Sequence, residues 1–345
     1  MEIVRESIFV TALRTFCRMF FGMIGILIAF FLFSFLYSSL TTSPLMVEKT
    51  TMQLVPDAKD KRQLVSISAP AILQIPIHGI IGDPQKLTSE MIGNVLIDSR
   101  THLLSHDRVK GILLHFNTPG GTVIDSDAIY RMLVEYKARY KVPIFAYVEG
   151  LCASGGMYIA SSADQIFADP SSIIGSVGVV IGPFFNIYGL MDIIGLQART
   201  LTEGIDKDMM NPTRPWKAGE DDSLKALTSF MYDRFVKIVT DARPRLDRTK
   251  LVNEYGAQVF DCVTAQQFGY IDQAMSNRNE ALLALLRAAN IDPEKPYQVV
   301  ALTPKHDWFS DLVSGKSPLI SGKVEHVFDF GQLPIREQFS YLYRP

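Results

Sequence analysis

Residues 148–179 read VEGLCASGGMYIASSADQIFADPSSIIGSVGV, and the rest of the chain is organised around this stretch. An apolar run typical of a strand, residues 143–148, leads into the small residues 152–156. Ser154 therefore lies where a loop becomes a helix. Unpaired N–H groups and the positive end of the helix dipole favour a developing negative charge there, and the two glycines that follow let another chain approach closely. The pattern predicts a nucleophilic serine.

A serine nucleophile needs a base to accept its proton. No histidine follows Ser154 until His306, and no lysine follows it until Lys207, in the stretch EGIDKDMMNP. A pair formed by Ser154 and Lys207 is therefore the leading hypothesis. Four histidines precede the serine, none in a matching motif, and chain order alone leaves them open as alternatives: His78, His102, His106 and His115.

The segment LLHFNTPGG, residues 113–121, is an apolar strand that ends in a turn with one proline and two glycines. Backbone N–H groups of such a turn can point outward, toward a substrate. A tetrahedral intermediate needs donors of this kind, and each contributes roughly 3–4 kcal/mol of transition-state stabilisation. The turn is a candidate oxyanion hole.

Three motifs closely resemble the signal peptide peptidase A (protease IV) family of bacterial membrane serine peptidases. They are NTPGG at 117–121, CASGGMYIASSADQIFADPSSIIGSVGVV at 152–180 and EGIDKDMMNP at 203–212. The resemblance extends over residues 71–276, with the motifs in the same order. It implies an α/β fold of the ClpP/crotonase-like type, built from repeated ββα units.

The resemblance also implies a role for each candidate site residue. Ser154 would be the nucleophile, Lys207 the general base and Ser176 the hydroxyl that orients the lysine. The oxyanion hole would be formed by Gly120 or Gly121 together with the N–H of Gly155. The chain departs from the family where Thr118 replaces a usual serine and Met157 replaces a usual tyrosine, and both changes are expected to affect the substrate groove rather than the chemistry.

The N-terminal region predicts a membrane anchor. Residues 19–40 carry no charge, and Arg5, Arg14 and Arg18 precede them. A segment of this length spans a bilayer, and the arginines place the N-terminus in the cytoplasm and the remainder outside. A cleaved signal peptide is the rival interpretation.

The strand–helix alternation after the anchor predicts α/β layers. The expected organisation is a cytoplasmic N-terminus at 1–18, one transmembrane helix at 19–40, a linker at 41–70, the peptidase domain at 71–290 and an irregular extension at 291–345. The formal net charge of −2 and the lack of basic runs mixed with aromatics argue against nucleic acid as a partner.

Cys152 and His115 are rival site residues, and the sequence also bears on metal and nucleotide sites. Cys152 is a second potential nucleophile, but with no histidine close in sequence it is expected to pack as a small apolar residue. His115 is expected to be a core or edge histidine. No metal-ligand spacing and no nucleotide motif is present, so we predict neither a metal nor a cofactor.

The predicted function is a membrane-anchored serine endopeptidase that cleaves hydrophobic peptides, such as remnant signal peptides, on the outer face of a bacterial inner membrane. The alternatives are an inactive membrane scaffold of the same fold and a crotonase-type acyl-CoA enzyme. Some relatives carry two tandem copies of the domain, whereas this chain has one. By resemblance, Ser154 of one subunit would therefore meet Lys207 of the next in a ring-like homo-oligomer.

Overall fold

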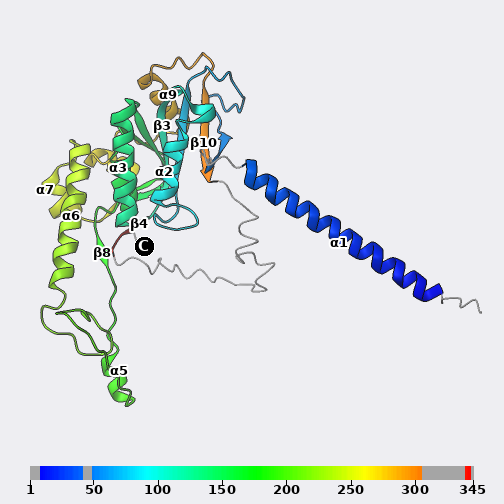
Figure 1. Cartoon of the computed structure of the whole chain (residues 1–345). Coiled ribbons are helices and arrows are strands. Elements are labelled where there is room, and N and C mark those ends of the chain that lie inside the picture. The colour runs from blue at the N-terminus through cyan, green and yellow to red at the C-terminus, as the bar shows by residue number, and fades with distance from the viewer. Residues whose placement is uncertain (1–7, 42–48, 305–338, 343–345) are drawn as a thin grey trace, which may run out of the picture. The chain divides into compact units, whose positions relative to one another are not determined.

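The computed structural model of the chain describes residues 8–41, 49–304 and 339–342 (Figure 1). The chain divides into two units, residues 1–48 and 49–345. In the first unit the described residues form helix α1, Ile8–Thr41, and its segment Ile8–Leu36 is long and apolar enough to cross a membrane. The helix starts before the predicted span at 19–40, because arginines such as Arg14 and Arg18 are good helix formers and continue it toward the N-terminus.

The second unit alternates strands and helices. Its elements are β1 (Thr50–Leu54), β2 (Ala71–His78), α2 (Ser89–Asp98), η1 (His102–Leu104), β3 (Val109–Thr118), β4 (Gly120–Thr122), α3 (Val123–Tyr140), β5 (Ile144–Ala153), α4 (Gly155–Ala160), β6 (Gln165–Ala168), β7 (Ile173–Gly175), β8 (Val180–Ile181), α5 (Tyr188–Ile193), α6 (Asp222–Ala242), α7 (Arg248–Lys250), η2 (Leu251–Tyr255), β9 (Val259–Asp261), α8 (Cys262–Phe268), α9 (Arg278–Ala288), β10 (Gln298–Pro304) and β11 (Phe339–Leu342).

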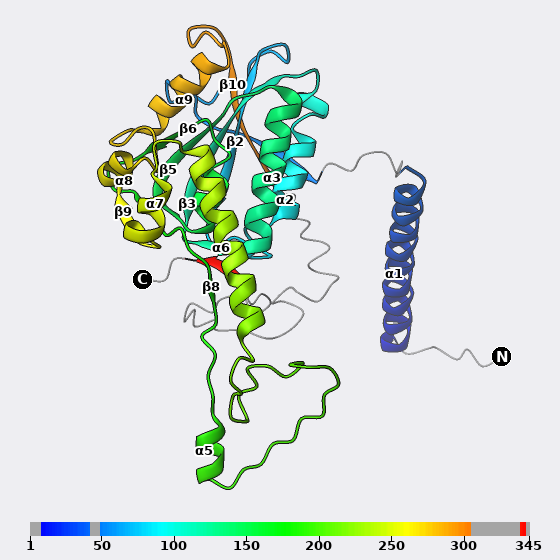
Figure 2. The ribbon, with the colours of Figure 1, turned by 90° about the vertical axis from the view of Figure 1, so that its left-hand side faces the viewer.

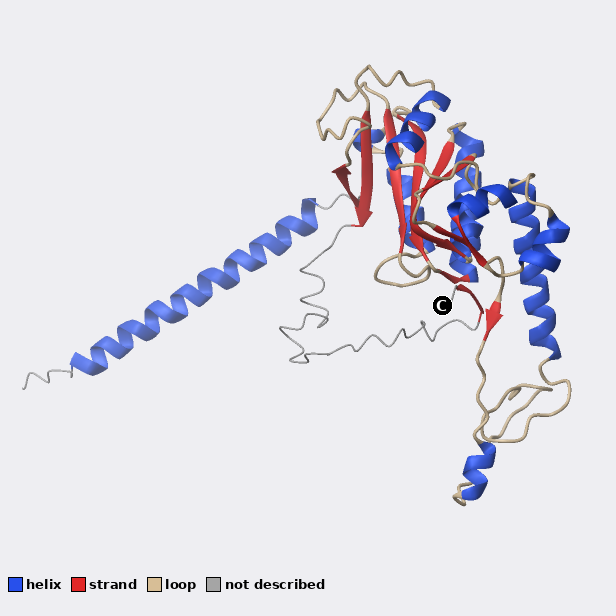
Figure 3. Ribbon diagram, turned by 180° about the vertical axis from the view of Figure 1, so that it is seen from behind, coloured by secondary structure: helices blue, strands red, loops and turns tan. Residues whose placement is uncertain are grey.

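The main sheet has the strand order β1-β10-β2-β3-β5-β7-β9, and β6 also pairs with β5. Strands β10, β2, β3 and β5 run parallel to one another. Helices α2, α3, α4 and α6 contribute to the core on one face of the sheet, and α9 covers the other (Figures 2 and 3). Because both faces are covered, the central strands read as continuous apolar runs.

Strand β3 shows how this works at the residue level. Ile112, Leu114 and Phe116 belong to the core on the α3 side of the sheet. Leu113, between them in sequence, belongs to the core on the α9 side. Alternate residues of a strand point to opposite faces, so an uninterrupted apolar run fills both layers.

Two strands of the main sheet lie in segments that the sequence predicted to be a linker or irregular, and so does β11. β1 falls in the predicted linker 41–70, and β10 falls in the predicted extension 291–345. The two pair antiparallel, and β10 adds to the sheet beside β2. The physical reason is burial, since Val299, Val300 and neighbouring apolar residues of β10 are enclosed by the core. Parts of these two predictions, residues 42–48, 305–338 and 343–345, lie outside the described residues.

An arm formed by residues 182–221 leaves the sheet after β8. It carries α5 away from the sheet and returns into the start of α6 (Figure 2). A second, three-stranded sheet with the order β4-β11-β8 lies where the arm departs.

Candidate active site

Ser154 occupies the tight turn between β5 and α4. Its backbone has φ 55° and ψ −116°, a conformation that costs roughly 1–3 kcal/mol for a residue with a side chain. The Ser154 N–H donates to the carbonyl of Gly175 at 2.9 Å, and the Ser154 carbonyl accepts from the N–H of Tyr158 at 3.1 Å. These two bonds hold the strained turn in place.

The Ser154 hydroxyl is buried and unpaired. The residue is 1% exposed, and its Oγ has no hydrogen-bond partner among the described residues. A buried hydroxyl without a partner costs about 1–3 kcal/mol. An acceptor and a reacting carbonyl brought in by another molecule would remove this cost, which is the behaviour expected of a nucleophile.

Ser176 lies next to Ser154 because of the strand register. β5 and β7 are parallel neighbours with Ala153 opposite Gly175, so each serine directly follows its strand. Ser176 also has a φ of 55°, and its N–H donates to the carbonyl of Gln258 at 2.7 Å. The structure therefore brings together two of the predicted site residues, each at a strained strand end.

The glycine turn after β3 joins the same edge of the sheet. Parallel strands β3 and β5 place Thr118 opposite Cys152, two residues before the nucleophile. The Thr118 hydroxyl donates to the Gly79 carbonyl at 2.6 Å and accepts from the Gly120 N–H at 3.1 Å. Thr118, which departs from the family pattern, thus accepts a hydrogen bond from the N–H of Gly120, one of the predicted oxyanion donors.

Gly121 presents its N–H to the opposite side of β4. The Ile81 N–H donates to the Gly120 carbonyl, and the Ile81 carbonyl accepts from the Thr122 N–H, both at 2.9 Å. Since successive residues of a strand direct their N–H and C=O groups to alternate sides, those of Gly121 point away from Ile81. A side chain at Gly121 would collide with the Ile81 backbone, so only glycine fits there.

Gly155 and Gly156 begin α4. As the first helical residue, Gly155 has an N–H with no acceptor within the helix. Gly156 packs so closely on β3 that an added Cβ would lie 2.8 Å from the Thr118 methyl group. The double glycine therefore brings the helix N-terminus against the strand that ends in the glycine turn.

A polar network fixes α4 to two other helices. The Tyr158 hydroxyl donates to Asp127 of α3 at 2.7 Å, and Arg234 of α6 donates to the same carboxylate at 2.7 Å. Burial alone would raise the pKa of Asp127, but the hydrogen bonds from Tyr158, Arg234 and Arg131 outweigh it and lower the pKa. The helix that follows the nucleophile is thereby tied to α6, into which the arm returns.

Lys207 lies on the arm, in the turn formed by residues 204–210, and its side chain is exposed. Within the chain it is not hydrogen-bonded to Ser154, whose Oγ has no partner among the described residues. The segment is a turn rather than an extended strand. Asp206 instead has a φ of 55°.

Arg214 organises the turn that carries Lys207. Its guanidinium donates to Asp208 at 2.9 Å and to the buried Glu220 at 2.7 Å. Hydrogen bonds from Arg214 lower the pKa values of both carboxyls. The carboxylate of Asp208, next to Lys207 in sequence, thus pairs with Arg214 rather than with the lysine amine.

The rival site residues have other partners. Cys152 is fully buried, its Sγ lies 3.8 Å from the Met157 sulfur, and burial raises the pKa of its thiol. A thiol in this environment is inert. His115 Nε2 lies 2.7 Å from Glu149 Oε2, its ring meets His78 edge-on, and burial lowers its pKa.

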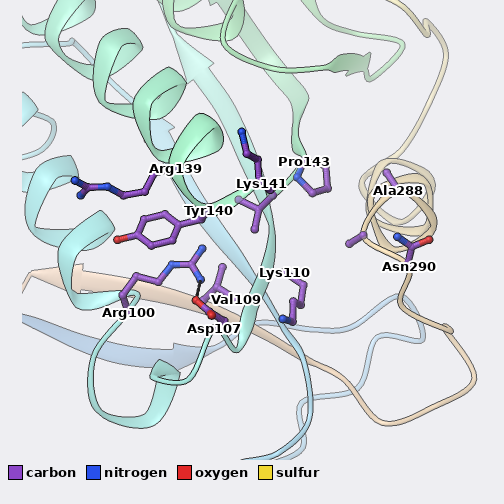
Figure 4. Close-up of a pocket in the computed structure, with 12 residues that line it drawn as sticks. Arg100, Asp107, Val109, Lys110, Arg139, Tyr140, Lys141, Pro143, Ala288 and Asn290 are labelled. Carbon is purple, nitrogen blue, oxygen red and sulfur yellow. Dashed lines mark hydrogen bonds and ion pairs between the residues drawn. The ribbon is translucent and has the colours of Figure 1, made fainter.

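A hollow of about 320 Å³, away from Ser154, is lined by the start of β3 and the ends of α3 and α9 (Figure 4). Arg100 pairs there with Asp107 at 3.4 Å and lies 3.9 Å from the ring centre of Tyr140. Arg139 and Lys141 lie at the C-terminal end of α3, where the helix dipole stabilises a positive charge. Helix termination explains these charges, so we assign this hollow no part in the chemistry.

The fold and the site define a class of protein: an α/β domain that presents a strained, buried serine at the edge of a parallel sheet. Residues 137–292 match the model of peptidase family S49, and residues 81–174 match that of Clp protease. These matches confirm the resemblance drawn from the sequence: this part of the chain is similar to peptidase family S49 and to Clp protease, and its α/β fold is of the ClpP-like type.

Individual proteins show the same relationship. The chain is 34% identical to a candidate protease of Methanocaldococcus jannaschii over 61% of its own length and 65% of the relative's. It is 29% identical to a candidate signal peptide peptidase SppA of Enterococcus faecium, over 59% of each chain. The match thus spans less than two thirds of each relative. A ClpP1 variant from Listeria monocytogenes superposes with a TM-score of 0.39 and 16% identity, covering 61% of this chain and 94% of that one.

Three features around the site were not predicted from the sequence: the hydrogen bonds of Tyr158, the ion pairs of Arg214 and the pairing of β11 with β4. The ties from α4 to α3 and α6 join Tyr158 to Asp127 and Arg234, which lie 31 and 76 residues away in sequence. Arg214 is closer to Lys207, and its position next to a predicted catalytic motif was the available signal. The pairing of β11 with β4 joins segments far apart in sequence, and neither segment carries a local pattern that predicts it.

Proposed function

We propose that this chain is a membrane-anchored serine endopeptidase that uses Ser154 as nucleophile and Lys207 of a neighbouring copy as general base. The observation that carries the proposal is the Ser154 hydroxyl, which is buried, held in a strained turn and unpaired. The match to peptidase family S49 supports the same chemistry.

In the proposed reaction, Ser154 Oγ attacks the carbonyl carbon of a peptide bond while the neutral amine of Lys207 accepts the hydroxyl proton. The amine then gives this proton to the leaving nitrogen, and the acyl-enzyme that remains is hydrolysed by water activated in the same way. Ser176, adjacent to the nucleophile, would orient the lysine amine.

The oxyanion would be stabilised by the N–H of Gly155 and by the glycine turn. Gly155 is suited to this role because its N–H has no acceptor within α4. Gly120 can contribute only when its N–H leaves Thr118 Oγ1, to which it now donates. Gly121 is the other candidate, since its N–H points away from Ile81.

A shared site is proposed because the lysine and the serine are not in contact within one chain. The arm that carries Lys207 exposes large apolar side chains, including Phe185 at 73%, Ile193 at 84% and Leu201 at 82%. Apolar surface of this kind marks an interaction site. We propose that it packs against the next subunit of a ring-like homo-oligomer and brings Lys207 to that subunit's Ser154.

Hydrophobic peptides are the proposed substrates. An apolar hollow of about 480 Å³ lies under β8, between the arm and α6, and its lining includes Ile181, Phe184 and Leu224. Such a hollow suits an apolar substrate side chain. With the uncharged part of α1, residues 19–40, in a bacterial inner membrane and Arg14 and Arg18 on the cytoplasmic side, the peptidase domain would face the extracytoplasmic side, next to remnant signal peptides.

The proposal is tested by mass-spectrometric mapping of cuts in a peptide library. The wild-type protein is expected to cut near apolar residues, whereas Ser154→Ala and Lys207→Ala are expected to produce no cuts above background. Matched controls are Ser162→Ala, another buried serine close to α4, and Lys217→Ala, another exposed lysine of the arm. Cleavage by Ser154→Ala at the wild-type rate would refute the proposal.

A further inference from the structure

Strand β5 contains a bulge shortly before the nucleophile. In its parallel pairing with β3, Val148 lies opposite Phe116, and the next pair in the register is Cys152 with Thr118. Between these two pairs β3 has one residue, Asn117, whereas β5 has three. The strand that carries the nucleophile therefore takes up two extra residues just before its turn. Bulges of this kind bend a strand and change the direction of the side chains that follow.

The bulge sets how far β5 reaches past the end of β3. Side chains repeat every second residue, so an excess of two residues leaves the faces of the strand unchanged. Val148 and Cys152 accordingly both belong to the core on the α3 side of the sheet. Each strand residue spans about 3.3 Å, so without the bulge Ser154 would lie roughly 6–7 Å farther along β5. The bulge thus keeps the nucleophile near the point where β3 ends and the candidate oxyanion donors begin.

The side chain of Asn117 fills the bulge. Its Oδ1 accepts a hydrogen bond from the N–H of Leu151 at 3.3 Å, so a side chain supplies an acceptor where the register between the strands is broken. Gly150, in the middle of the bulge, has a φ of 101°, and a Cβ added there would lie 2.9 Å from Asn117 Oδ1. Asn117 therefore packs directly on the bulged backbone, and glycine is the residue that suits both this conformation and this contact.

His115 holds the first residue of the bulge. Its Nε2–H donates to the Glu149 carboxylate at 2.7 Å, because a carboxylate can only accept. The His115 ring stacks on Tyr147 with 5.5 Å between ring centres, and it meets the His78 ring edge-on at 4.7 Å. The bulge is thus fixed at its start by His115 and at its end by Asn117.

Asn117 lies on the face of the sheet away from α4. Leu113 belongs to the core on the α9 side, and alternation along β3 places Asn117 on that same side. Helix α4, which follows Ser154, packs in the core on the opposite side. Any effect of Asn117 on the nucleophile is therefore transmitted through the backbone of β5.

We propose that Asn117 is a positioning residue for Ser154, because by holding the bulge it fixes where β5 enters the strained turn. The inference rests on the proposed function for the role of Ser154 as nucleophile. Loss of the Asn117 acceptor would let the bulge relax and would displace the serine relative to the oxyanion donors. A displacement of this kind slows the reaction more than it weakens substrate binding.

The role of the acceptor is tested by comparing Asn117→Leu with Asn117→Asp in the full chain. Leucine is close to asparagine in shape but has no acceptor, whereas aspartate keeps Oδ1. Asn117→Leu should lower kcat for a fluorogenic apolar peptide by about tenfold or more with KM unchanged, and Asn117→Asp should restore most of that loss. Wild-type kcat in Asn117→Leu, or equal losses in the two variants, would overturn the inference.

Gln74→Leu is the matched control for a purely structural loss. Gln74 lies on the same face of the sheet, opposite Leu113 and away from the bulge, and its Oε1 accepts from Arg278 Nε at 2.9 Å. This variant should lower the midpoint of urea unfolding and leave kcat unchanged. A fall in kcat as large as that of Asn117→Leu would mean that any weakening of this face slows the reaction, which would overturn the positioning role.

Hydrogen–deuterium exchange separates failure of the inference from failure of the proposed function, because it needs no catalysis. In the full chain carrying Ser154→Ala, Asn117→Leu should speed exchange of the amides at 150–153 and leave those at 112–114 unchanged, and Asn117→Asp should change neither. Unchanged exchange at 150–153 in Asn117→Leu would overturn the inference whatever the turnover. Absence of turnover in every form, together with the faster exchange, would refute the peptidase and leave Asn117 as the residue that holds the bulge.

Discussion

Mixing two inactive variants gives a quantitative prediction about the shared site. Ser154→Ala chains lack the nucleophile, Lys207→Ala chains lack the base, and each preparation alone should be inactive. When equal amounts are dissociated and reassembled, a site is intact if its serine comes from a Lys207→Ala chain and its lysine from a Ser154→Ala neighbour. With random mixing in a head-to-tail ring, each condition is met half of the time, so about one quarter of the sites are complete.

The assay is hydrolysis of a fluorogenic apolar peptide, with two affinity tags to confirm mixed assemblies. Activity should return to about one quarter of the wild-type rate per chain, because every complete site contains an unaltered pair. A matched control mixes wild type with the Ser154→Ala/Lys207→Ala double variant. About one quarter of the sites should be complete if the two residues come from neighbouring chains, and about half if both come from the same chain. Confirmed mixed assemblies without activity, together with half activity in the control, would refute the shared site.

Four further predictions concern the arm, the α4 network and the N-terminal unit. Arg214→Gln should speed deuterium exchange over residues 204–210 and lower kcat about tenfold, since a misplaced base loses orientation. Arg214 lowers the pKa of Asp208, so the ion pair is fully formed above the ordinary carboxyl pKa of about 3.9 and is lost as the pH falls through the lowered pKa. Acidification of the wild type below about pH 4 should therefore increase deuterium exchange over residues 204–210. Tyr158→Phe removes a hydrogen bond to the Asp127 carboxylate and should lower the free energy of unfolding by about 1–2 kcal/mol in urea titrations, with an unchanged value arguing against the network. Deleting residues 1–48 should leave a folded domain with the wild-type circular dichroism spectrum, since β1 remains in place, and loss of that spectrum would show that α1 is needed for folding.

The parts of the site that follow one another closely in sequence could be predicted from it. The apolar run before Ser154, the two glycines after it and the small residues beyond specify a strand, a tight turn and a helix, and the structure has all three. The break after β3 at Pro119 was also predictable from the proline, although Gly120 and Gly121 lie in strand β4 rather than in a turn. The parallel pairing of β3 with β5 then places this break and the Ser154 turn at one edge of the sheet.

The parts that depend on long-range pairing could not be predicted. β1 and β10 are separated by more than 240 residues, and their short sequences resemble linkers until they pair. Arg234 and Asp127 meet across 107 residues, and either would be interpreted as a solvated surface charge in isolation. The engagement of the Gly120 N–H by Thr118 depends on a rotamer, which residue identity alone does not specify. Each is a product of tertiary packing rather than of local propensity.

The pairing of Ser154 with Lys207 is tested most directly by identifying the residue that a serine-directed fluorophosphonate probe modifies. The full-length protein is incubated with the probe, digested, and the modified peptide sequenced by mass spectrometry, with Lys207→Ala and Lys217→Ala treated in parallel. We expect a single adduct on Ser154 in the wild type and in Lys217→Ala, and at least a hundredfold slower labelling in Lys207→Ala, in keeping with loss of general-base assistance. An adduct on another residue, or equally fast labelling of Ser154 in Lys207→Ala, would refute the proposed pair.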